Sequence, residues 1–192
     1  MPGYPLFLKL EGERCLVFGG GKVATRKIQS LLRCGALVTC VSKDFSKAIR
    51  NWAGKKKAAL DSSLRLRLLR RASGASRPPA ARLPPGQGEA GNDELNGAKL
   101  VIVATSDRDF NARVAKICRK KKILVNVVDD PKLCDFYVPA VLERGPLQVA
   151  ISTGGASPLF ARRLREELEK AIPVSTGKML EKLGKIREKT RA

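Results

Sequence analysis

The stretch that decides the fold is Cys15-Leu-Val-Phe-Gly-Gly-Gly-Lys-Val-Ala24, in which an apolar run stops at three glycines and a helical pattern follows at once. Within it, Gly19-x-Gly21-x-x-Ala24 fits the G-x-G-x-x-G/A fingerprint of dinucleotide-binding sites. The first glycine permits a tight turn, the second lets the backbone approach a pyrophosphate, and the small third residue lets helix and strand pack closely. A glycine cluster can also be a plain turn, but its place between a strand and a helix favours nucleotide binding.

The residues on either side of these glycines complete a strand–helix–strand unit. Arg14–Phe18 is predicted to be a strand and Lys22–Cys34 the following helix, because its apolar residues recur at roughly helical spacing. Gly35 is a typical residue for ending that helix, and Leu37–Val41 is the second predicted strand. This length is typical of a βαβ unit, so the predicted fold class is α/β with a parallel sheet.

Composition restricts the chemistry that the chain can perform. With 192 residues and 43% hydrophobic content, the chain is long enough for one α/β domain with a smaller appendage. It contains no histidine, which excludes Ser-His-Asp and Cys-His nucleophiles and most zinc sites, and we expect no metal site. Proton transfer must then use Asp, Glu, Lys, Tyr or Cys. The five cysteines lack C-x-x-C spacing and are expected to be reduced, structural thiols.

The net charge of +20 favours polyanionic partners, either nucleic acid or a small polycarboxylate. From Lys47 to Arg82 there are 11 basic residues against one acidic residue, Asp61, and we interpret this stretch as a solvated basic insert. Ala72–Gly91 is rich in proline and glycine and is predicted to be a flexible loop. Leu64–Leu69 is compatible with an edge strand or a short helix.

Because no apolar run approaches membrane-spanning length and no signal peptide is recognisable, we expect a cytoplasmic protein without a membrane partner.

Two further buried strands are predicted after the basic stretch. Leu100–Ala104 is followed by Thr105-Ser106-Asp107, and Asp109 or Asn111 is expected to cap a helix that runs to about Lys120. Ile123–Val128 ends in Asp129-Asp130-Pro131. Open α/β sheets place their sites at the carboxyl ends of parallel strands, which is where these polar residues fall.

The pattern changes after Phe136. Tyr137–Leu142 and Leu147–Ser152 are predicted strands joined by a turn, and a second glycine loop, Thr153-Gly-Gly-Ala-Ser-Pro158, opens a helix. A last amphipathic helix carries Met179, Leu183 and Ile186. We expect three parts: residues 1–136 as the nucleotide-binding domain, 137–158 as a hairpin with the glycine loop, and 159–192 as a helical segment.

Several motifs occur together in order. They are Tyr4-Pro-Leu-Phe-Leu-Lys-Leu10, the glycine fingerprint, Leu100-Val-Ile-Val-Ala-Thr-Ser-Asp107, Val125-Asn-Val-Val-Asp-Asp-Pro131, Phe136-Tyr-Val-Pro139 and Ile151-Ser-Thr-Gly-Gly-Ala-Ser-Pro158 with Ala161-Arg-Arg-Leu164. Together they resemble precorrin-2 dehydrogenase, the NAD-dependent module of sirohaem synthase, over nearly the whole chain except about residues 47–91.

The resemblance implies a Rossmann domain, a small strand-containing dimerisation segment, a helical C-terminal part and a homodimer. It implies oxidation of precorrin-2 to sirohydrochlorin with NAD as hydride acceptor; in some members the module also inserts ferrous iron. The family's key aspartate ends the Asn-Val-Val-Asp motif, which corresponds to Asp129.

The expected site combines the resemblance with the residues themselves. Asp129 is expected to be catalytic, as a base or by orienting substrate, although Asp-Pro sequences also form plain turns. The expected cofactor-binding residues are Gly19, Gly21, Lys22, Val23, Ala24, Lys43, Asp44 and Thr105. The expected substrate-binding residues are Asn126, Thr153, Gly154, Gly155, Ser157 and Arg162, because a glycine loop before a helix and nearby arginines suit carboxylates; a helix cap beside a solvated basic face is the plainer interpretation.

Two other functions are compatible with parts of this pattern. A non-catalytic NAD-sensing module would explain the fingerprint but leaves the second glycine loop and its basic helix without a role. A nucleic-acid-binding protein would use the basic segment, but that segment lacks interleaved aromatic residues and a known binding motif, so no specific nucleic-acid partner is expected.

Overall fold

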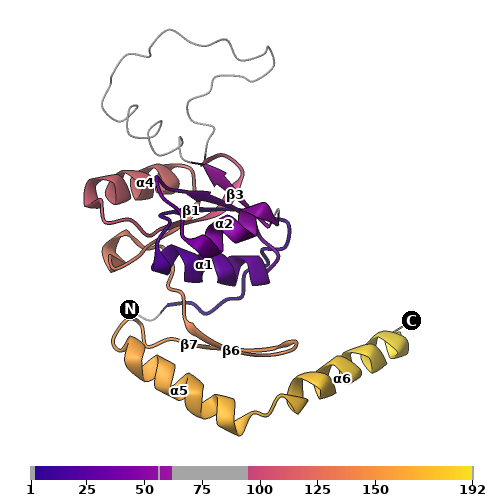
Figure 1. Cartoon of the computed structure of the whole chain (residues 1–192). Coiled ribbons are helices and arrows are strands. Elements are labelled where there is room, and N and C mark those ends of the chain that lie inside the picture. The colour runs from indigo at the N-terminus through magenta and orange to yellow at the C-terminus, as the bar shows by residue number, and fades with distance from the viewer. Residues whose placement is uncertain (1–2, 56, 62–94, 192) are drawn as a thin grey trace. The chain divides into compact units, whose positions relative to one another are not determined.

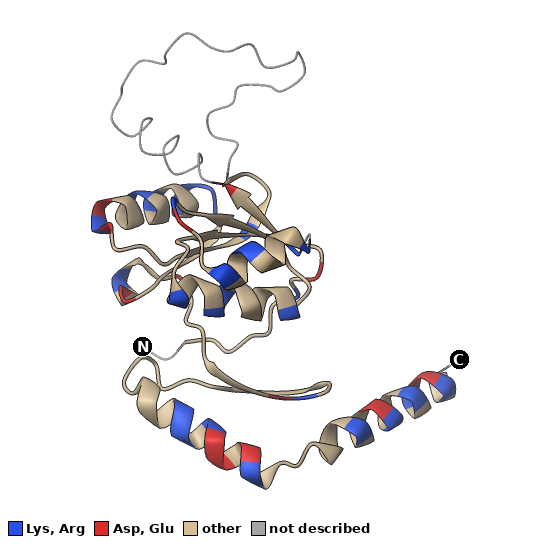
Figure 2. Ribbon diagram, in the orientation of Figure 1, with Lys and Arg blue, Asp and Glu red and all other residues tan. Residues whose placement is uncertain are grey.

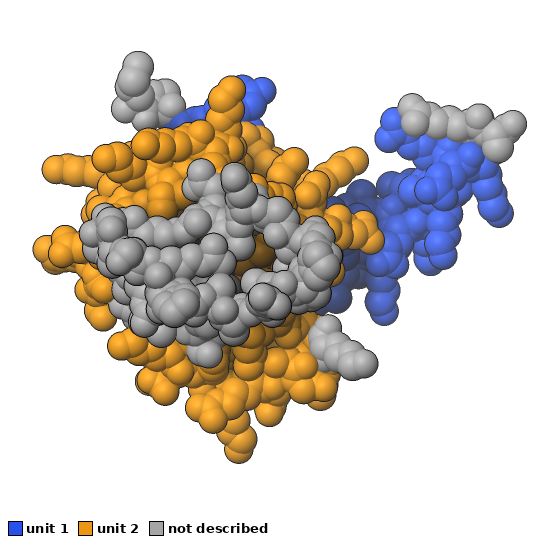
Figure 3. All heavy atoms as spheres, turned by 90° about the horizontal axis from the view of Figure 1, so that it is seen from above, with its two compact units in different colours: residues 1–5, 137–192 blue, residues 6–136 orange. Residues whose placement is uncertain are grey.

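The computed structural model describes residues 3–55, 57–61 and 95–191, and these divide into two compact units. Unit 2 is Leu6–Phe136, and unit 1 combines Met1–Pro5 with Tyr137–Ala192 (Figure 3). The sequence expectations for residues 64–69 and for the loop at 72–91 lie outside the described residues.

Unit 2 contains a five-stranded parallel sheet in the order β3-β2-β1-β4-β5 (Figure 1). Its strands are β1 (Arg14–Phe18), β2 (Leu37–Val41), β3 (Ala58–Asp61), β4 (Ala98–Val103) and β5 (Leu124–Val127). Every pair of neighbouring strands is parallel. The strand order runs outward from β1 through β2 to β3 and resumes on the other side of β1 with β4 and β5, which puts the change of direction between β1 and β4, where such sheets bind ligands.

Helices cover both faces of this sheet. On one face, α1 (Lys22–Arg33) and α2 (Lys47–Gly54) bury Ala24, Ile28, Leu31 and Ile49 against alternate residues of β1, β2 and β4. On the other face, α4 (Arg108–Lys120) buries Phe110, Val114 and Cys118 against the remaining strand residues. Because both faces are covered, the strands are nearly continuous apolar runs, and the α/β Rossmann-type fold expected from the sequence is confirmed.

Several element boundaries match the expectations and others differ; β6 (Ala140–Arg144), for example, begins three residues later than the strand predicted at Tyr137–Leu142. β1 and β2 have the predicted bounds, while β4 begins two residues earlier and β5 is shorter than predicted. The expected cap of the helix after β4 was wrong, because Asp107 fills this role: its carboxylate accepts a hydrogen bond of 2.9 Å from the Phe110 amide.

The first part of the basic stretch forms a helix and a strand of the α/β fold. Lys47–Gly54 is α2, whose N-cap is Ser46, and Ala58–Asp61 is the edge strand β3. These elements extend the first βαβ unit, so the stretch interpreted as a basic insert from Lys47 begins inside the nucleotide-binding fold.

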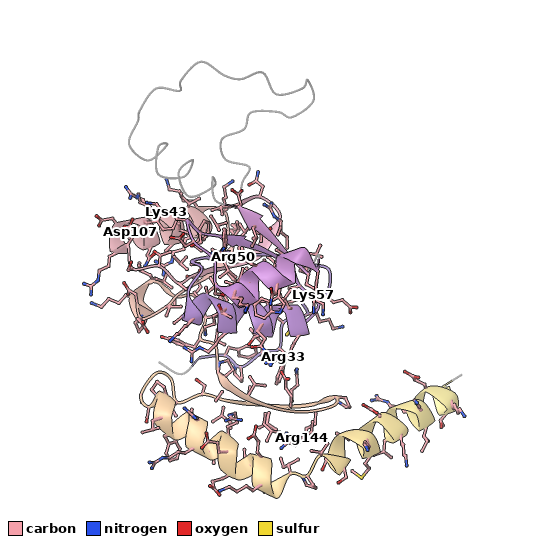
Figure 4. All side chains as sticks on the ribbon, in the orientation of Figure 1. Arg33, Lys43, Arg50, Lys57, Asp107 and Arg144 are labelled. Carbon is pink, nitrogen blue, oxygen red and sulfur yellow. The ribbon has the colours of Figure 1, made fainter. Side chains whose placement is uncertain are left out.

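Unit 1 consists of a hairpin and two helices. Strands β6 (Ala140–Arg144) and β7 (Leu147–Ile151) pair antiparallel, and α5 (Pro158–Ala171) and α6 (Ser175–Arg191) follow. Arg144, labelled in Figure 4, donates from Nε to the Ile172 carbonyl at 3.0 Å and from Nη2 to the Glu169 carbonyl at 3.1 Å, which ties the hairpin to the end of α5. Lys and Arg alternate with Asp and Glu along both helices (Figure 2). Over the described part of the chain, no helix is long and apolar enough to cross a membrane.

Candidate functional site

The glycine loop after β1 lies against the carboxyl ends of the neighbouring strands. The Gly19 amide donates to the Val41 carbonyl at 2.8 Å, and Gly19 has a φ of 116°, a conformation that only glycine adopts readily. A Cβ at Gly19 would lie 2.3 Å from the Ala104 carbonyl oxygen. The first fingerprint glycine is therefore required by the fold itself.

The middle glycine, which the fingerprint leaves unspecified, is under the same constraint. A Cβ at Gly20 would lie 1.8 Å from the Asp44 carbonyl oxygen, and the Gly20 carbonyl accepts from the Ser46 amide at 2.9 Å. Gly20 thus lets the turn after β2 approach the loop after β1. The run of three glycines at 19–21 is visible in the sequence, but the spacing of the fingerprint gives no role to Gly20.

Gly21 is different, because it faces open space. It is the N-cap of α1, no side chain caps that end of the helix, and a Cβ added there would meet no heavy atom within 4 Å. Lys22 and Val23 follow in the first turn, which contains no acidic residue, and Ala24 is buried on the sheet. An uncapped helix N-terminus with a glycine and a lysine fits a pyrophosphate, so these residues fit the implied dinucleotide.

The turn after β2 lies beside this loop. Lys43 and Asp44 are exposed there, and the Thr25 and Ser46 hydroxyls, 2.8 Å apart, join the first turns of α1 and α2. The Thr25 hydroxyl also donates to the Gly21 carbonyl at 2.9 Å. The turn that presents Asp44 is therefore fixed against the glycine loop.

Thr105 follows β4 at the same edge of the sheet. Its hydroxyl donates to Oδ1 of buried Asn111 at 2.5 Å, and Asn111 Nδ2 donates back to the Thr105 carbonyl at 3.0 Å. Asn111 was expected as a helix cap; instead it holds the Thr105 turn. The Thr105 backbone is thereby fixed where β4 ends.

Asp129 lies two residues beyond β5, and its side chain is exposed at this edge. Its φ of 63° is in the left-handed region, which is unusual for a residue with a Cβ but is tolerated best by Asn and Asp. Asp130, beside it, is half-buried, and its amide donates to the Val127 carbonyl at 3.3 Å. Such conformations persist where surrounding contacts impose them, and they are common at functional sites.

Asn126 and Cys134 bond to the chain on either side of Asp129. Asn126, a buried residue of β5, donates from Nδ2 to the Phe136 carbonyl at 2.9 Å. The Cys134 thiol accepts from the Val127 amide at 3.2 Å and approaches the Val127 and Asp130 carbonyls at 3.1 and 3.3 Å. No motif in the sequence marks Cys134. Together these bonds hold both ends of the loop that carries Asp129.

Lys27 is a further charged group near this loop. It follows the glycine loop on α1, next to buried Ile28, and is half-buried. Burial lowers the pKa of the Lys27 ammonium, as does the charge of Arg26, whereas Cys134 and Asp129 oppose this change. The only feature of the sequence that marks Lys27 is its position beside the apolar residues of α1.

The second group of expected residues belongs to unit 1. Ser157 is the N-cap of α5, where its hydroxyl accepts from the Phe160 amide at 3.2 Å and its own amide donates to the Thr153 hydroxyl at 3.0 Å. Gly154 and Gly155 have φ values of 62° and 88° with open space where a Cβ would be. Arg162 is exposed and pairs with Glu166 at 2.9 Å. The structure joins Thr153 and Ser157 in one cap, with Arg162 on the following turn.

No cluster of three or more His, Cys, Asp or Glu side chains suited to a metal ion occurs among the described residues. The five cysteines are free thiols, as the sequence indicates. Burial raises the pKa of Cys15 to about 11 and those of Cys40 and Cys118 to about 12, which fits packing roles.

Two family models match the chain. One, described as putative NAD(P)-binding, spans residues 6–140, and the other, described as sirohaem biosynthesis protein central, spans residues 144–171. The first covers most of the chain and nearly coincides with unit 2. Unit 2 is therefore a unit for binding a nicotinamide dinucleotide.

Individual proteins agree with these matches. The chain is 39% identical to a siroheme synthase of Methylococcus capsulatus over 187 residues, which are 97% of this chain and 34% of that protein. It is 38% identical to a siroheme synthase of Thioalkalivibrio sulfidiphilus over 179 residues, 93% of this chain and 32% of that protein. The chain thus spans about a third of the length of these curated relatives. The solved structure of SirC, a precorrin-2 dehydrogenase, matches with 30% identity and a TM-score of 0.68 over 96% of this chain and 79% of that one.

Proposed function

The chain belongs to the precorrin-2 dehydrogenase family, and from this we propose that it oxidises precorrin-2 to sirohydrochlorin with NAD as the hydride acceptor. The observation that carries the proposal is the arrangement at one edge of the sheet. The glycine loop after β1 and the Asp129 turn after β5 both lie at the carboxyl ends of parallel strands. A dehydrogenase needs a bound nicotinamide and a group that handles a proton, and this edge offers residues suited to both.

We assign the cofactor to the glycine loop and the two neighbouring turns. The first turn of α1, from Gly21 to Ala24, would hold the pyrophosphate, with the Lys22 ammonium near its charge. Gly19 shapes the loop, and the Thr105 turn lies beside it at the end of β4. A nicotinamide held there would supply the acceptor for the hydride that leaves the macrocycle.

NAD is the proposed cofactor rather than NADP. Asp44, exposed after β2, lies about where an acidic residue receives the ribose 2′-hydroxyl and repels a 2′-phosphate. Lys43 beside it is the competing feature, since an ammonium would attract that phosphate. The fixed position of the Asp44 backbone against Gly20 supports a direct contact with the ribose.

Asp129 is the proposed base. Oxidation of precorrin-2 removes a hydride and a proton, and in a chain without histidine a carboxylate is a suitable acceptor for the proton. Asn126 is proposed to act on the substrate through the loop that it holds, because its amide already bonds to Phe136.

The loop before α5 is the proposed binding site for the substrate carboxylates. Thr153, Gly154, Gly155 and Ser157 form a polar turn at a helix N-terminus, and Arg162 adds a cation one turn later. The Arg162–Glu166 pair is exposed, so the arginine can exchange that partner at small cost. Precorrin-2 is a polycarboxylate, which suits such a surface.

Unit 1 is also the proposed dimerisation surface. It exposes large apolar side chains along the hairpin region and both helices, among them Tyr137, Leu159, Phe160, Met179 and Ile186. Surfaces of this kind usually meet another protein, and we propose that the partner is a second copy of this chain.

The proposed division of the chain has three parts, residues 1–136, 137–158 and 159–192. The proposed location is the cytoplasm.

The test is direct. The purified protein is incubated with precorrin-2 and NAD, and NADH and sirohydrochlorin absorbance are followed with and without ferrous iron. Stoichiometric NADH and sirohydrochlorin are expected. Absence of both products under anaerobic conditions, with NAD binding retained, would favour the non-catalytic NAD-sensing function. The iron arm reports separately whether iron is inserted as a second substrate.

A further inference from the structure

The turn that follows β4 lies between the two loops that the proposed function uses. A Cβ at Gly19 would lie 2.3 Å from the Ala104 carbonyl oxygen, so the glycine loop is in close contact with this turn. On the other side, the amide of Val128, the residue before Asp129, donates to the carbonyl of Val103, the last residue of β4, at 2.9 Å. The turn after β4 is therefore joined to the glycine loop and to the loop that carries Asp129.

This position determines which part of the cofactor the turn meets. The pyrophosphate is assigned to the N-terminus of α1, after β1, and the adenosine ribose to Asp44, after β2. In the sheet, β2 lies on one side of β1 and β4 on the other. Because the pyrophosphate is in the middle of the dinucleotide, the nicotinamide half extends over the end of β4, toward Asp129.

One buried side chain, that of Asn111 on α4, holds this turn. Among the polar and charged residues in the described part of the chain, only Asn111 and Asn126 are buried, and Asn111 is 5% exposed. Its amide group bonds twice to one residue: Oδ1 accepts from the Thr105 hydroxyl at 2.5 Å, and Nδ2 donates to the Thr105 carbonyl at 3.0 Å. The Thr105 hydroxyl also accepts from the Asp107 amide at 3.3 Å.

The needs of the helix do not explain this asparagine. Asp107 already caps α4, since its carboxylate accepts from the Phe110 amide at 2.9 Å. Asparagine is a poor helix former, and a buried amide group costs stability unless its hydrogen bonds are made. Val114, three residues later on α4, is buried without that cost. What Asn111 adds over an apolar residue is the pair of bonds that fixes Thr105.

We propose that Asn111 is a positioning residue for the nicotinamide half of the cofactor. It holds Thr105 and the turn around it in the arrangement which that half requires, while other elements bind the adenosine and the pyrophosphate. This inference rests on the proposed function and extends the cofactor site to α4. A turn that is fixed before the cofactor binds has less conformational freedom to lose on binding, so its rigidity adds to affinity.

ADP separates the two halves of the cofactor, because it has the adenosine and both phosphates but no nicotinamide riboside. Asn111→Ala is expected to raise the Kd for NAD about tenfold, since two hydrogen bonds that fix the turn are lost, and to leave the Kd for ADP within about twofold of wild type. Isothermal titration calorimetry measures both constants in the purified protein.

Val114→Ala is the matched control. Val114 lies on the same helix, is buried like Asn111, and has no polar group with which to hold the turn. Its truncation leaves a cavity in the core and is expected to lower stability to urea at least as much as Asn111→Ala, but to change neither Kd. The comparison distinguishes the positioning of the turn from general loosening of α4.

Variants of Thr105 test the same bonds from the other side. Thr105→Val keeps the volume of the side chain but removes the hydroxyl that bonds to Asn111, and it is expected to weaken binding of NAD but not of ADP. Thr105→Ser keeps the hydroxyl and is expected to retain most of the NAD affinity. In the double variant with Asn111→Ala, the loss is expected to be smaller than the sum, because both changes act through one bond. If Asn111→Ala does not fold, the two Thr105 variants decide the question.

This inference and the proposed function fail differently. Unchanged NAD affinity in Asn111→Ala, or in Thr105→Val, overturns the positioning role. Equal weakening of NAD and ADP also overturns it, because Asn111 then supports the nucleotide site as a whole. A wild type that binds NAD but does not oxidise precorrin-2 contradicts the proposed function and leaves the role of Asn111 to these titrations. A wild type that binds neither NAD nor ADP contradicts both.

Discussion

At the scale of single residues, the backbone decides what Asp129 can do. Its backbone is left-handed, Asn126 and Cys134 bond to the loop on either side of it, and its side chain is exposed after a buried strand. The sequence motif predicts an aspartate at this edge, but it carries no information about φ. One of the bonds that hold this loop joins Asn126 to the Phe136 carbonyl, ten positions later in the chain.

Asp129→Asn tests the assignment of this carboxylate as the base. Asparagine tolerates the same backbone conformation, so the fold and NAD binding are expected to persist. Loss of a proton acceptor is expected to reduce kcat by ~10²–10⁴. Stopped-flow or steady-state NADH formation measures this, with Asp130→Asn as the control. A rate within a few-fold of wild type would refute the assignment.

Asp44→Ala tests cofactor choice. Removal of the carboxylate is expected to lower kcat/KM for NAD about tenfold and to improve use of NADP, because a hydrogen bond and a repulsion are both lost. The measurement is the ratio of specificity constants for the two cofactors in wild type and variant. If wild type already uses both equally, or the ratio does not change, Asp44 does not discriminate.

The cysteines differ in expected reactivity. The pKa of Cys15 is raised to about 11 and those of Cys40 and Cys118 to about 12, because burial disfavours the thiolate. Cys34 is exposed. Iodoacetamide at pH 8 is therefore expected to alkylate Cys34 first in the native protein, and the three buried thiols only after unfolding. Peptide mass spectrometry over time checks the order; rapid native labelling of Cys118 would contradict it.

At the scale of elements, strands with a strong apolar signal were predictable and edge elements were not. Gly19 follows Arg14–Phe18 and Gly35 shortly precedes Leu37–Val41, and most residues of both strands are apolar, so their bounds could be read from the sequence. β3, Ala58–Asp61, is an edge strand with no fully buried residue, and α2 presents one buried residue, Ile49. Neither β3 nor α2 shows the regular spacing of apolar residues by which a strand or a helix is recognised in a sequence.

Within the glycine loop, Gly20 is expected to be needed for folding and Gly21 for NAD binding. Gly20→Ala is expected to destabilise the protein by about 1–3 kcal/mol, because the new methyl group would overlap the Asp44 carbonyl. Gly21→Ala, with open space at the Cβ position, is expected to leave stability nearly unchanged and to weaken NAD binding.

Urea unfolding and NAD titration of the two variants make the comparison. Equal losses of stability would show that Gly21 also has a packing role. Normal NAD affinity in Gly21→Ala would contradict the placement of the pyrophosphate at this helix N-terminus.

At the scale of the whole molecule, the sequence predicted which residues gather at the candidate site, but not which contacts hold them there. The cofactor and Asp129 groups belong to one sheet edge because parallel strands share that edge. The capping bonds of Ser157 follow from its place before Pro158. Gly20 could not be assigned, since its importance comes from the Asp44 carbonyl, which only the folded chain brings close.

The net charge of +20 has its own consequence for substrate capture. If precorrin-2 is the substrate, its encounter with the protein is dominated by attraction between its carboxylates and this positive field. The range of that attraction falls from about 10 Å at 0.1 M salt to about 3 Å at 1 M. The KM for precorrin-2 is therefore expected to rise with salt, whereas the Kd for NAD, a smaller anion held largely by backbone amides, changes less. Steady-state kinetics and NAD titrations in chloride and in acetate separate screening from binding of a particular anion. A KM for precorrin-2 that does not change with salt would mean that the basic residues serve another partner, and recovery of nucleic acid with the protein at moderate salt would identify its class.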